Sequence, residues 1–278
     1  MCALVVFLAS AGVAAQALTT ADDLPPAIVL KPLFAQRAQL LDVALLDRGG
    51  LLALDRSEVA RYELAEELST VQTAPRWRKL ESVALPPRAW PRDLRGHLTR
   101  VSGQYNVLLP GTACTVQLGP LRMTCNDARA AWAYGIPNEG LEPGRNYFTT
   151  PEGLAAYGGT SLSDGKGALI ADRQGKLLQL DENRRPLAEL GAGDDVIRVP
   201  TVCRGRADYY LAASHGPDGD VLRAFEIDGG RLVQAAPDFP LPGLFTSLSN
   251  VDLKAFVITR LPGGDRYDAF QADISCRR

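Results

Sequence analysis

Apolar positions along this chain gather into short runs of strand length, and pairs of these runs are joined by short turns. Five such pairs recur: Leu51 to Leu64, Gln104 to Leu118, Gly167 to Leu180, Asp208 to Ile227 and Leu253 to Ile274. In the fourth pair, the run Tyr209 to Ser214 is largely apolar on both alternating faces, which is typical of a strand covered on both sides. Recurring hairpins of this kind predict radial β architecture, in which each hairpin is the middle of one blade.

Further strand-like runs flank the five hairpins. Candidate inner strands precede them: Leu40 to Asp47, His97 to Ser102, Leu154 to Leu162, Val196 to Cys203 and Phe245 to Ser249. Candidate outer strands follow the first four: Arg78 to Leu85, Leu121 to Asn126, Pro186 to Leu190 and Arg231 to Ala235. The fifth hairpin has no following strand, and Ala27 to Phe34 can supply it from the other end of the chain. The pattern therefore predicts an all-β protein, a β-propeller of five four-stranded blades closed by an N-terminal strand.

Two alternatives to this architecture stay open at the level of sequence. The stretch Ser57 to Val71 contains EVARYELAEEL, which could form a helix and cost the first blade a strand. A β-sandwich with two Greek keys is the main structural rival, because it also uses many short alternating strands.

The first residues have the form of a secretory signal peptide. Met1 to Ala17 carries no charge, contains the apolar stretch Ala3 to Val13, and ends in the small-residue tripeptide Ala15-Gln16-Ala17. The stretch is shorter than the roughly 20 apolar residues that a membrane-spanning helix needs. We therefore expect a signal peptide at residues 1–17, a single propeller domain at residues 18–278, and a periplasmic or extracellular location.

Charge and composition narrow the classes of partner. The chain has 30 basic and 32 acidic residues, a net charge of −2, and no long run of either sign. This balance argues against a nucleic-acid surface, and no later segment is apolar for long enough to insert in a membrane. The 26 glycines and 19 prolines are spread between strands as turn residues, as a loop-rich β protein requires. We expect a monomer.

Four cysteines remain once the signal peptide with Cys2 is removed. In an exported chain an even number predicts two disulfides, although four cysteines permit three pairings. Cys114 with Cys125 would staple one hairpin, and Cys203 with Cys276 would tie the last blade to its neighbour, but the sequence leaves the connectivity open. No C-x-x-C pair occurs and the chain has only 2 histidines, so we expect no metal and no cofactor.

Segments near the C-terminus resemble a known class of repeat protein. The stretches YYLAASHGPDGDVLRAFEI and RYDAFQADISC resemble blades of secreted bacterial β-propeller repeat proteins of the FG-GAP and VCBS-like kind. The resemblance implies a blade layout and extends loosely over the mature chain. Those repeats often carry a calcium turn of the form D-x-D-x-D-G, which is missing from all five turns here, so the resemblance implies neither calcium nor a function.

Two long connections are the best candidates for a ligand-binding face. Pro86 to Gly96 and Asp127 to Pro151 would share one face of a propeller with the turn of the fourth hairpin, and each combines arginines with aromatic residues, one in the first connection and four in the second. Aromatic faces mixed with arginine and amide donors suit flat or extended ligands. The predicted ligand-binding residues are Trp90, Arg92, Trp132, Tyr134, Arg145, Asn146, Tyr147 and His215. The alternative is that the aromatic residues only pack the loops onto the blade edges.

An enzyme is the second functional class to consider. Glycoside hydrolysis needs two carboxylates about 5 to 9.5 Å apart. Acidic residues near the openings of the inner strands are Asp42, Asp93, Glu139, Asp194 and Asp195. With 32 acidic residues in the chain, a few beside strands are expected by chance, and no nucleophile or cofactor motif occurs. The sequence favours a non-catalytic propeller that binds a protein or glycan ligand, with a glycoside hydrolase or an envelope assembly scaffold as alternatives.

Overall fold

All secondary structure in the described residues is β-strand, arranged in five antiparallel sheets. The computed structural model describes residues 26–47, 49–66, 75–87, 96–101, 103–109, 112–127, 148–149, 155–172, 174–200, 208–252 and 254–275. The expected signal peptide lies outside these residues. No helix in the described part of the chain has the length and apolar character needed to cross a membrane.

Each sheet is built from strands that follow one another along the chain. The first contains β2 (Leu40–Leu46), β3 (Gly50–Asp55), β4 (Glu58–Glu66) and β5 (Arg76–Ala84). The second contains β6 (His97–Val101), β7 (Gln104–Leu109), β8 (Thr112–Leu118) and β9 (Leu121–Asp127). The third contains β10 (Phe148–Thr149), β11 (Ala155–Ser161), β12 (Ala168–Asp172), β13 (Lys176–Leu180) and β14 (Pro186–Ala192).

The remaining two sheets follow the same plan with two variations. The fourth contains β15 (Asp195–Val199), β16 (Tyr209–Ser214), β17 (Val221–Asp228), β18 (Arg231–Gln234) and the short β19 (Phe239–Pro240), which pairs with β17. The fifth contains β20 (Leu244–Val251), β21 (Lys254–Arg260), β22 (Tyr267–Ser275) and β1 (Ala27–Gln36). All five predicted hairpins are therefore confirmed as the middle strands of successive sheets.

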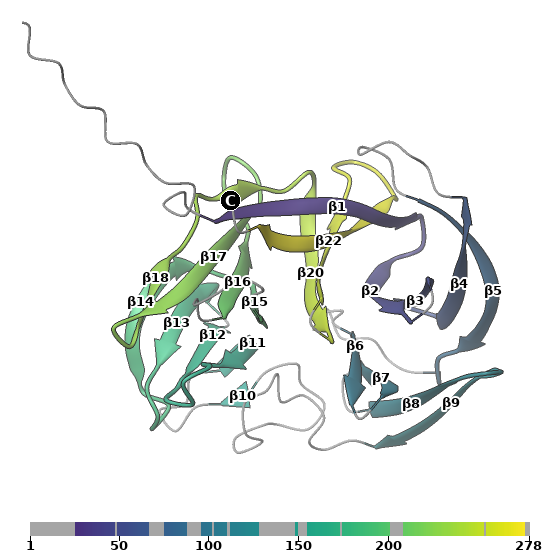
Figure 1. Cartoon of the computed structure of the whole chain (residues 1–278), viewed down its shortest axis with the longest axis horizontal. Helices are drawn as coiled ribbons and strands as arrows, with labels where there is room; N and C mark the ends of the chain where they lie inside the picture. Colours follow the sequence, from purple (N-terminus) through teal and green to yellow (C-terminus); the bar gives the residue numbers. More distant parts are fainter. Residues whose placement is uncertain are drawn as a thin grey trace, which may run out of the picture.

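The sheets surround a common centre, as Figure 1 shows, with β2, β6, β11, β15 and β20 innermost. Neighbouring sheets touch through these inner strands: β2 contacts β6 and β20, and β15 contacts β11 and β20. Radial sheets that pack face to face are the defining feature of a β-propeller. The predicted propeller is confirmed, and the β-sandwich alternative is wrong.

The ring is closed by strands from opposite ends of the chain. β1 pairs antiparallel with β22 from Ala27 with Ser275 to Gln36 with Tyr267. The expected closing strand is thus confirmed, and it runs two residues beyond Phe34. The helix considered for Ser57 to Val71 is wrong where the structure describes it, because β4 pairs with β3 from Val59 to Glu63 and with β5 from Glu58 to Glu66.

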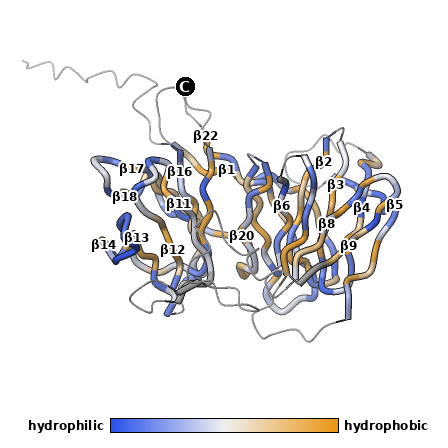
Figure 2. The backbone as a smooth tube through the Cα atoms, turned by 90° about the horizontal axis from the view of Figure 1, so that it is seen from below, coloured by the Kyte–Doolittle hydropathy of each residue, from blue (hydrophilic) through white to orange (hydrophobic). Residues whose placement is uncertain are grey.

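The core lies between the blades, where inner and middle strands such as β2, β3, β12, β16 and β21 are buried on both faces. Every residue of β16 is buried, and Leu51, Leu52 and Leu54 of β3 are fully shielded from solvent. In Figure 2 hydrophobic positions follow the strands inside each blade, and hydrophilic positions gather at the turns. Removing this much apolar surface from water is the main stabilising contribution to the fold.

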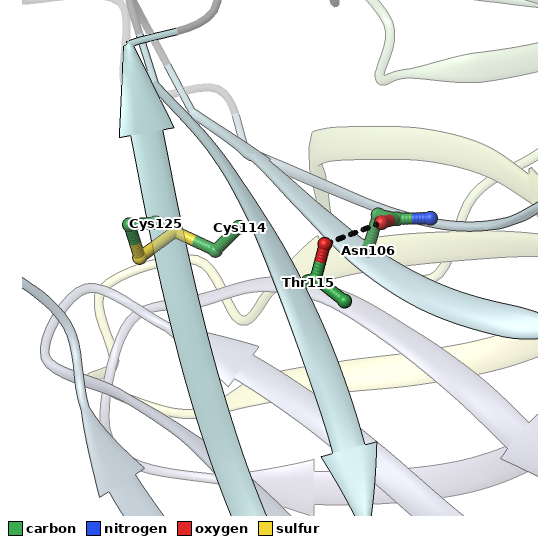
Figure 3. The surroundings of a disulfide bond; sticks show 4 residues. All are labelled: Asn106, Cys114, Thr115 and Cys125. Carbon is green, nitrogen blue, oxygen red and sulfur yellow. Dashed lines mark hydrogen bonds between the residues drawn. A yellow bond between two sulfur atoms is a disulfide. The ribbon is translucent and has the colours of Figure 1, made fainter.

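One of the two expected disulfides lies in the described residues and is confirmed. Cys114 of β8 and Cys125 of β9 face each other in the strand register, with their Cα atoms 4.0 Å apart and their sulfur atoms bonded. Figure 3 shows the bridge beside a hydrogen bond from Thr115 to Asn106 of β7. Cys203 and Cys276 lie outside the described residues, so their pairing stays a prediction.

Candidate ligand-binding groove

Most of the predicted ligand-binding residues lie outside the part of the chain that the structure describes. Those residues are Trp90, Arg92, Trp132, Tyr134, Arg145, Asn146 and Tyr147. His215 is described, on the exposed turn between β16 and β17. The loop face expected from the two long connections therefore stays a prediction.

His215 has an acidic partner that the sequence did not reveal. Its Nδ1 lies 2.8 Å from Oδ2 of Asp220, whose side chain is almost fully buried, while the imidazole is about half exposed. The same Asp220 carboxylate accepts a hydrogen bond from the backbone N–H of Phe245, in the neighbouring blade. The histidine is thus fixed to the seam between the fourth and fifth blades by a carboxylate that also joins those blades.

Asp42, a candidate for glycoside hydrolysis, serves as a junction between three blades. Its carboxylate accepts hydrogen bonds from the backbone N–H groups of Val43 (2.7 Å) and Leu98 (2.6 Å) and from Oγ of Ser249 (2.5 Å). Leu98 belongs to β6 and Ser249 to β20. Burial raises the pKa of the Asp42 carboxyl to about 7, although these three hydrogen bonds act in the opposite direction.

Of the other hydrolase candidates, the structure describes Asp194 and Asp195, and both make contacts within the protein. Asp195 adds to the raised pKa of Asp42 through its charge, but it is 1% exposed and lies against Gly158, where a Cβ would come within 2.3 Å of its Oδ1. Asp194 accepts a hydrogen bond from the backbone N–H of His215. Asp93 and Glu139 lie outside the described residues. The carboxylates of Asp42 and Asp194 thus accept hydrogen bonds from other parts of the protein, and those of Asp42 join three blades.

A groove of about 1020 Å³ lies at the perimeter, where β1 and β22 of the fifth blade meet β4 and β5 of the first. We call it the seam groove. Figure 1 shows the C-terminal end of β1 running toward β4 and β5, so the groove follows the seam that closes the ring. Its apolar lining includes Pro32, Phe34, Tyr62, Trp77 and Phe270, and its polar lining includes Gln36, Arg37, Arg76, Arg266 and Asp268.

The shape of β1 determines which of its residues reach the groove. The strand register shifts between Pro32 and Phe34, and this bulge allows Leu33 and Phe34, which are adjacent in sequence, both to be buried. Pro32 suits this outer strand because proline cannot donate to a further strand. The carbonyl of Leu33 accepts a hydrogen bond of 2.7 Å from Nε1 of Trp77, so the first blade holds the bulge directly.

Aromatic side chains from both blades meet in the groove. The ring of Phe34 packs edge-on against Tyr62 of β4, with centroids 4.9 Å apart, an arrangement that aromatic pairs prefer. Burial also raises the pKa of the Tyr62 phenol. Part of the lining of the seam groove is therefore formed by aromatic rings that pack against each other.

The polar lining of the groove is mainly cationic. Among the described lining residues, three are arginines and one is an aspartate. Asp268 pairs with Arg266 at 2.8 Å, and Arg37, Arg76 and Arg266 are all exposed. Within the described residues, no group of three or more histidine, cysteine or acidic side chains is placed to hold a metal ion. The groove presents guanidinium groups and aromatic rings.

Sequence reasoning missed the seam groove because its residues are scattered through strands far apart in the chain. Phe34, Trp77 and Phe270 come together only when β1 joins the fifth blade beside the first. The prediction that Ala27 to Phe34 closes the ring contained the necessary signal. Placing that strand next to the outer strand of the first blade would have brought Phe34 and Trp77 to one seam.

No protein-family model and no curated protein sequence matches this chain. The chain is similar in structure to the WD40 repeats of RRP9, with 10% identity, a TM-score of 0.46, and coverage of 90% of this chain and 99% of that one. It is also similar to U3-55K, with 10% identity, a TM-score of 0.47, and coverage of 89% and 99%. Virginiamycin B lyase from Staphylococcus aureus matches with 9% identity, a TM-score of 0.44, and coverage of 88% and 99%.

Proposed function

We propose that this chain is an exported, non-catalytic binding protein that captures a protein or glycan ligand in the seam groove. The observation that carries the proposal is the groove itself, an open cavity of about 1020 Å³ that combines aromatic side chains with exposed arginines. Rigid aromatic surface beside a few fixed polar groups is the usual composition of a ligand site. The surrounding β-strands hold these groups in place without a ligand, which reduces the entropic cost of binding.

Export is supported by two features of the chain. Residues 1–17 have the pattern of a secretory signal, and the Cys114–Cys125 disulfide is of a kind that persists in oxidising compartments. We therefore propose a periplasmic or extracellular location. The resemblance of its last blades to secreted bacterial repeat proteins agrees with this location.

A binding screen with groove variants tests the proposal. The chain from residue 18 onward would be screened against glycan and peptide arrays, together with Phe270→Ala in the groove. Arg122→Ala, which changes an exposed side chain of β9, is the control. We expect Phe270→Ala to weaken binding of the captured ligand about tenfold or more, and Arg122→Ala to leave it unchanged. Full binding by the groove variant would place the site elsewhere.

A glycan-cleaving hydrolase is the second candidate, and the raised pKa of Asp42 beside Asp195 is the observation in its favour. Both side chains are buried, and the oxygens of Asp42 already accept three hydrogen bonds. A substrate would have to displace contacts that join three blades. Release of reducing ends from a bound glycan, abolished by Asp42→Asn in a variant that still folds, would favour the hydrolase over the binding protein.

A further inference from the structure

The cationic lining of the seam groove indicates the charge of its ligand. The whole chain has a net charge of −2, yet the described polar lining of the groove contains three arginines and only Asp268 as an acid. This local excess does not follow from overall composition. Arginine holds carboxylates through two parallel hydrogen bonds, so the groove is complementary to a ligand that carries carboxylates along its length.

The backbone of β1 indicates which kind of acidic ligand fits. An extended peptide usually adds to an exposed sheet edge through main-chain hydrogen bonds. In the groove, Pro32 has no N–H to offer, and the carbonyl of Leu33 is occupied by the indole of Trp77. A ligand strand therefore cannot pair with β1 at Pro32 and Leu33, and the side chains of the groove must recognise the ligand.

The aromatic lining favours sugar rings as the partners of those side chains. Tyr62, Trp77 and Phe270 are partly exposed and come from three different strands, so they offer apolar surfaces along the groove. The C–H-rich face of a pyranose ring packs on such surfaces, while its hydroxyl groups remain available to polar side chains such as Gln36. Carboxylates on the same rings would then meet Arg37 at the rim, together with the N–H groups of Arg266 that Asp268 does not already occupy.

We propose that the seam groove binds a uronate-bearing oligosaccharide, an acidic linear glycan. This inference rests on the proposed binding function and names its ligand class. Binding has an electrostatic component, because the ligand carboxylates pair with guanidinium groups of the groove. The affinity for the acidic glycan therefore falls as salt is raised from 50 to 500 mM, whereas stacking on the aromatic residues changes little.

The test uses the mature chain and defined oligosaccharides. Fragments of polygalacturonate, alginate and hyaluronan, each about six sugars long, would be compared by calorimetry with their carboxyl-reduced counterparts. We expect at least one acidic fragment to bind, with a loss of tenfold or more on carboxyl reduction. Arg37→Ala and Arg266→Ala should each weaken binding about tenfold, and Arg122→Ala should not.

Three results would overturn the inference. One is that none of the acidic fragments binds, another is that the reduced fragments bind equally well, and the third is that polyglutamate binds at the groove as tightly as the best glycan. Circular dichroism of each variant would show that the fold is intact. If a neutral glycan or a peptide binds and Phe270→Ala weakens it, the binding function stands and only the acidic ligand is wrong. If no ligand responds to any groove variant, both proposals fail.

Discussion

The buried carboxylate of Asp42 accepts hydrogen bonds that connect three blades, but its ionisation inside the protein costs free energy. It receives hydrogen bonds from its own strand, from β6 and from β20, and Nδ1 of His97 lies 3.8 Å from its Oδ2. Complete burial nevertheless disfavours the ionised form. The charge is tolerated because the three donors replace much of the water that ionisation requires.

This balance predicts how stability depends on pH. The pKa of Asp42 is about 7 in the folded chain and near 3.8 when exposed, so the folded state holds this proton more tightly. The stabilisation from this group is fully present below about pH 4 and is lost as pH rises to about 7, by an amount on the order of 4 kcal/mol. Denaturant unfolding from pH 4 to 8 should show this decline for the natural chain relative to Asp42→Asn.

The asparagine variant also tests the direction of the hydrogen bonds. Its Oδ1 can still accept from Val43 and Ser249, but its amide would face the N–H of Leu98, so a constant loss of stability is expected at every pH. Parallel stability curves for the two proteins across this range would contradict the assigned pKa. The prediction compares differences, so the titration of other carboxyl groups cancels.

At the scale of elements, the contact between β1 and β5 decides how firmly the closing strand is held. The indole of Trp77 donates to the carbonyl of Leu33 at the bulge, and this bond crosses from the first blade to the fifth. The outer strand of a blade otherwise exposes its free edge to solvent. The bond therefore fixes β1 at the point where its register changes.

Trp77→Phe should lower the free energy of unfolding by about 1 kcal/mol, plus a contribution from the smaller ring, because the Leu33 carbonyl loses its donor. Thermal and urea unfolding would measure the loss. Tyr105→Phe is a matched control, since it removes a longer bond of 3.3 Å to the carbonyl of Leu45 and should have a smaller effect. Equal losses in the two variants would argue against a special role for the indole.

The Cys114–Cys125 bridge is the second element-scale constraint. It joins directly opposed residues of β8 and β9 at a separation of 11 residues. In the chain-entropy model, a loop of about 12 residues contributes roughly 3 kcal/mol. Replacing both cysteines with alanine should lower stability by about that amount while the circular dichroism spectrum stays that of a β protein. Unfolding of the double variant at room temperature would show that blade packing contributes less than we infer.

At the scale of the whole molecule, polar side chains connect neighbouring blades across several seams. Gln179 of β13 donates to the Gly230 carbonyl and accepts from the Leu232 N–H, which joins the third and fourth blades. Glu81 of β5 accepts from the Leu121 N–H and joins the first and second. Arg100 of β6 pairs with Asp47 and Asp252, which come from two other blades. Such bonds fix the angle between blades, which apolar packing alone leaves less defined.

The second expected disulfide belongs to this scale, because it would connect the fourth and fifth blades. We predict that the mature chain, denatured without reductant, shows no free thiol among its four cysteines. Thiol titration and peptide mapping would check this, and a linked Cys203–Cys276 peptide is the expected product. Two reactive thiols at these positions would leave the Cys114–Cys125 bridge as the only one in the mature chain.

The sequence was most informative about strands and least informative about the site. An apolar run such as Tyr209 to Ser214 marks a buried strand because successive side chains of a strand point to opposite faces. A run that is apolar at every position therefore indicates that both faces are covered. The groove depends on Phe34, Trp77 and Phe270 lining one cavity, and no local pattern encodes how adjacent blades meet. The acidic partners show the same limit: Asp220 is five residues from His215, but its burial and its bond to Phe245 follow from the seam.

The pairing of Ala27 with Ser275 also has a consequence for engineering and for folding. The two ends of the described fold lie side by side in one ladder, so a short peptide could join them and the chain could be cut open at another blade. Such a circular permutant would keep every strand pair but make the fifth blade contiguous in sequence. It should refold faster than the natural chain, because β1 and β22 would then be separated by a short linker and no longer by most of the polypeptide.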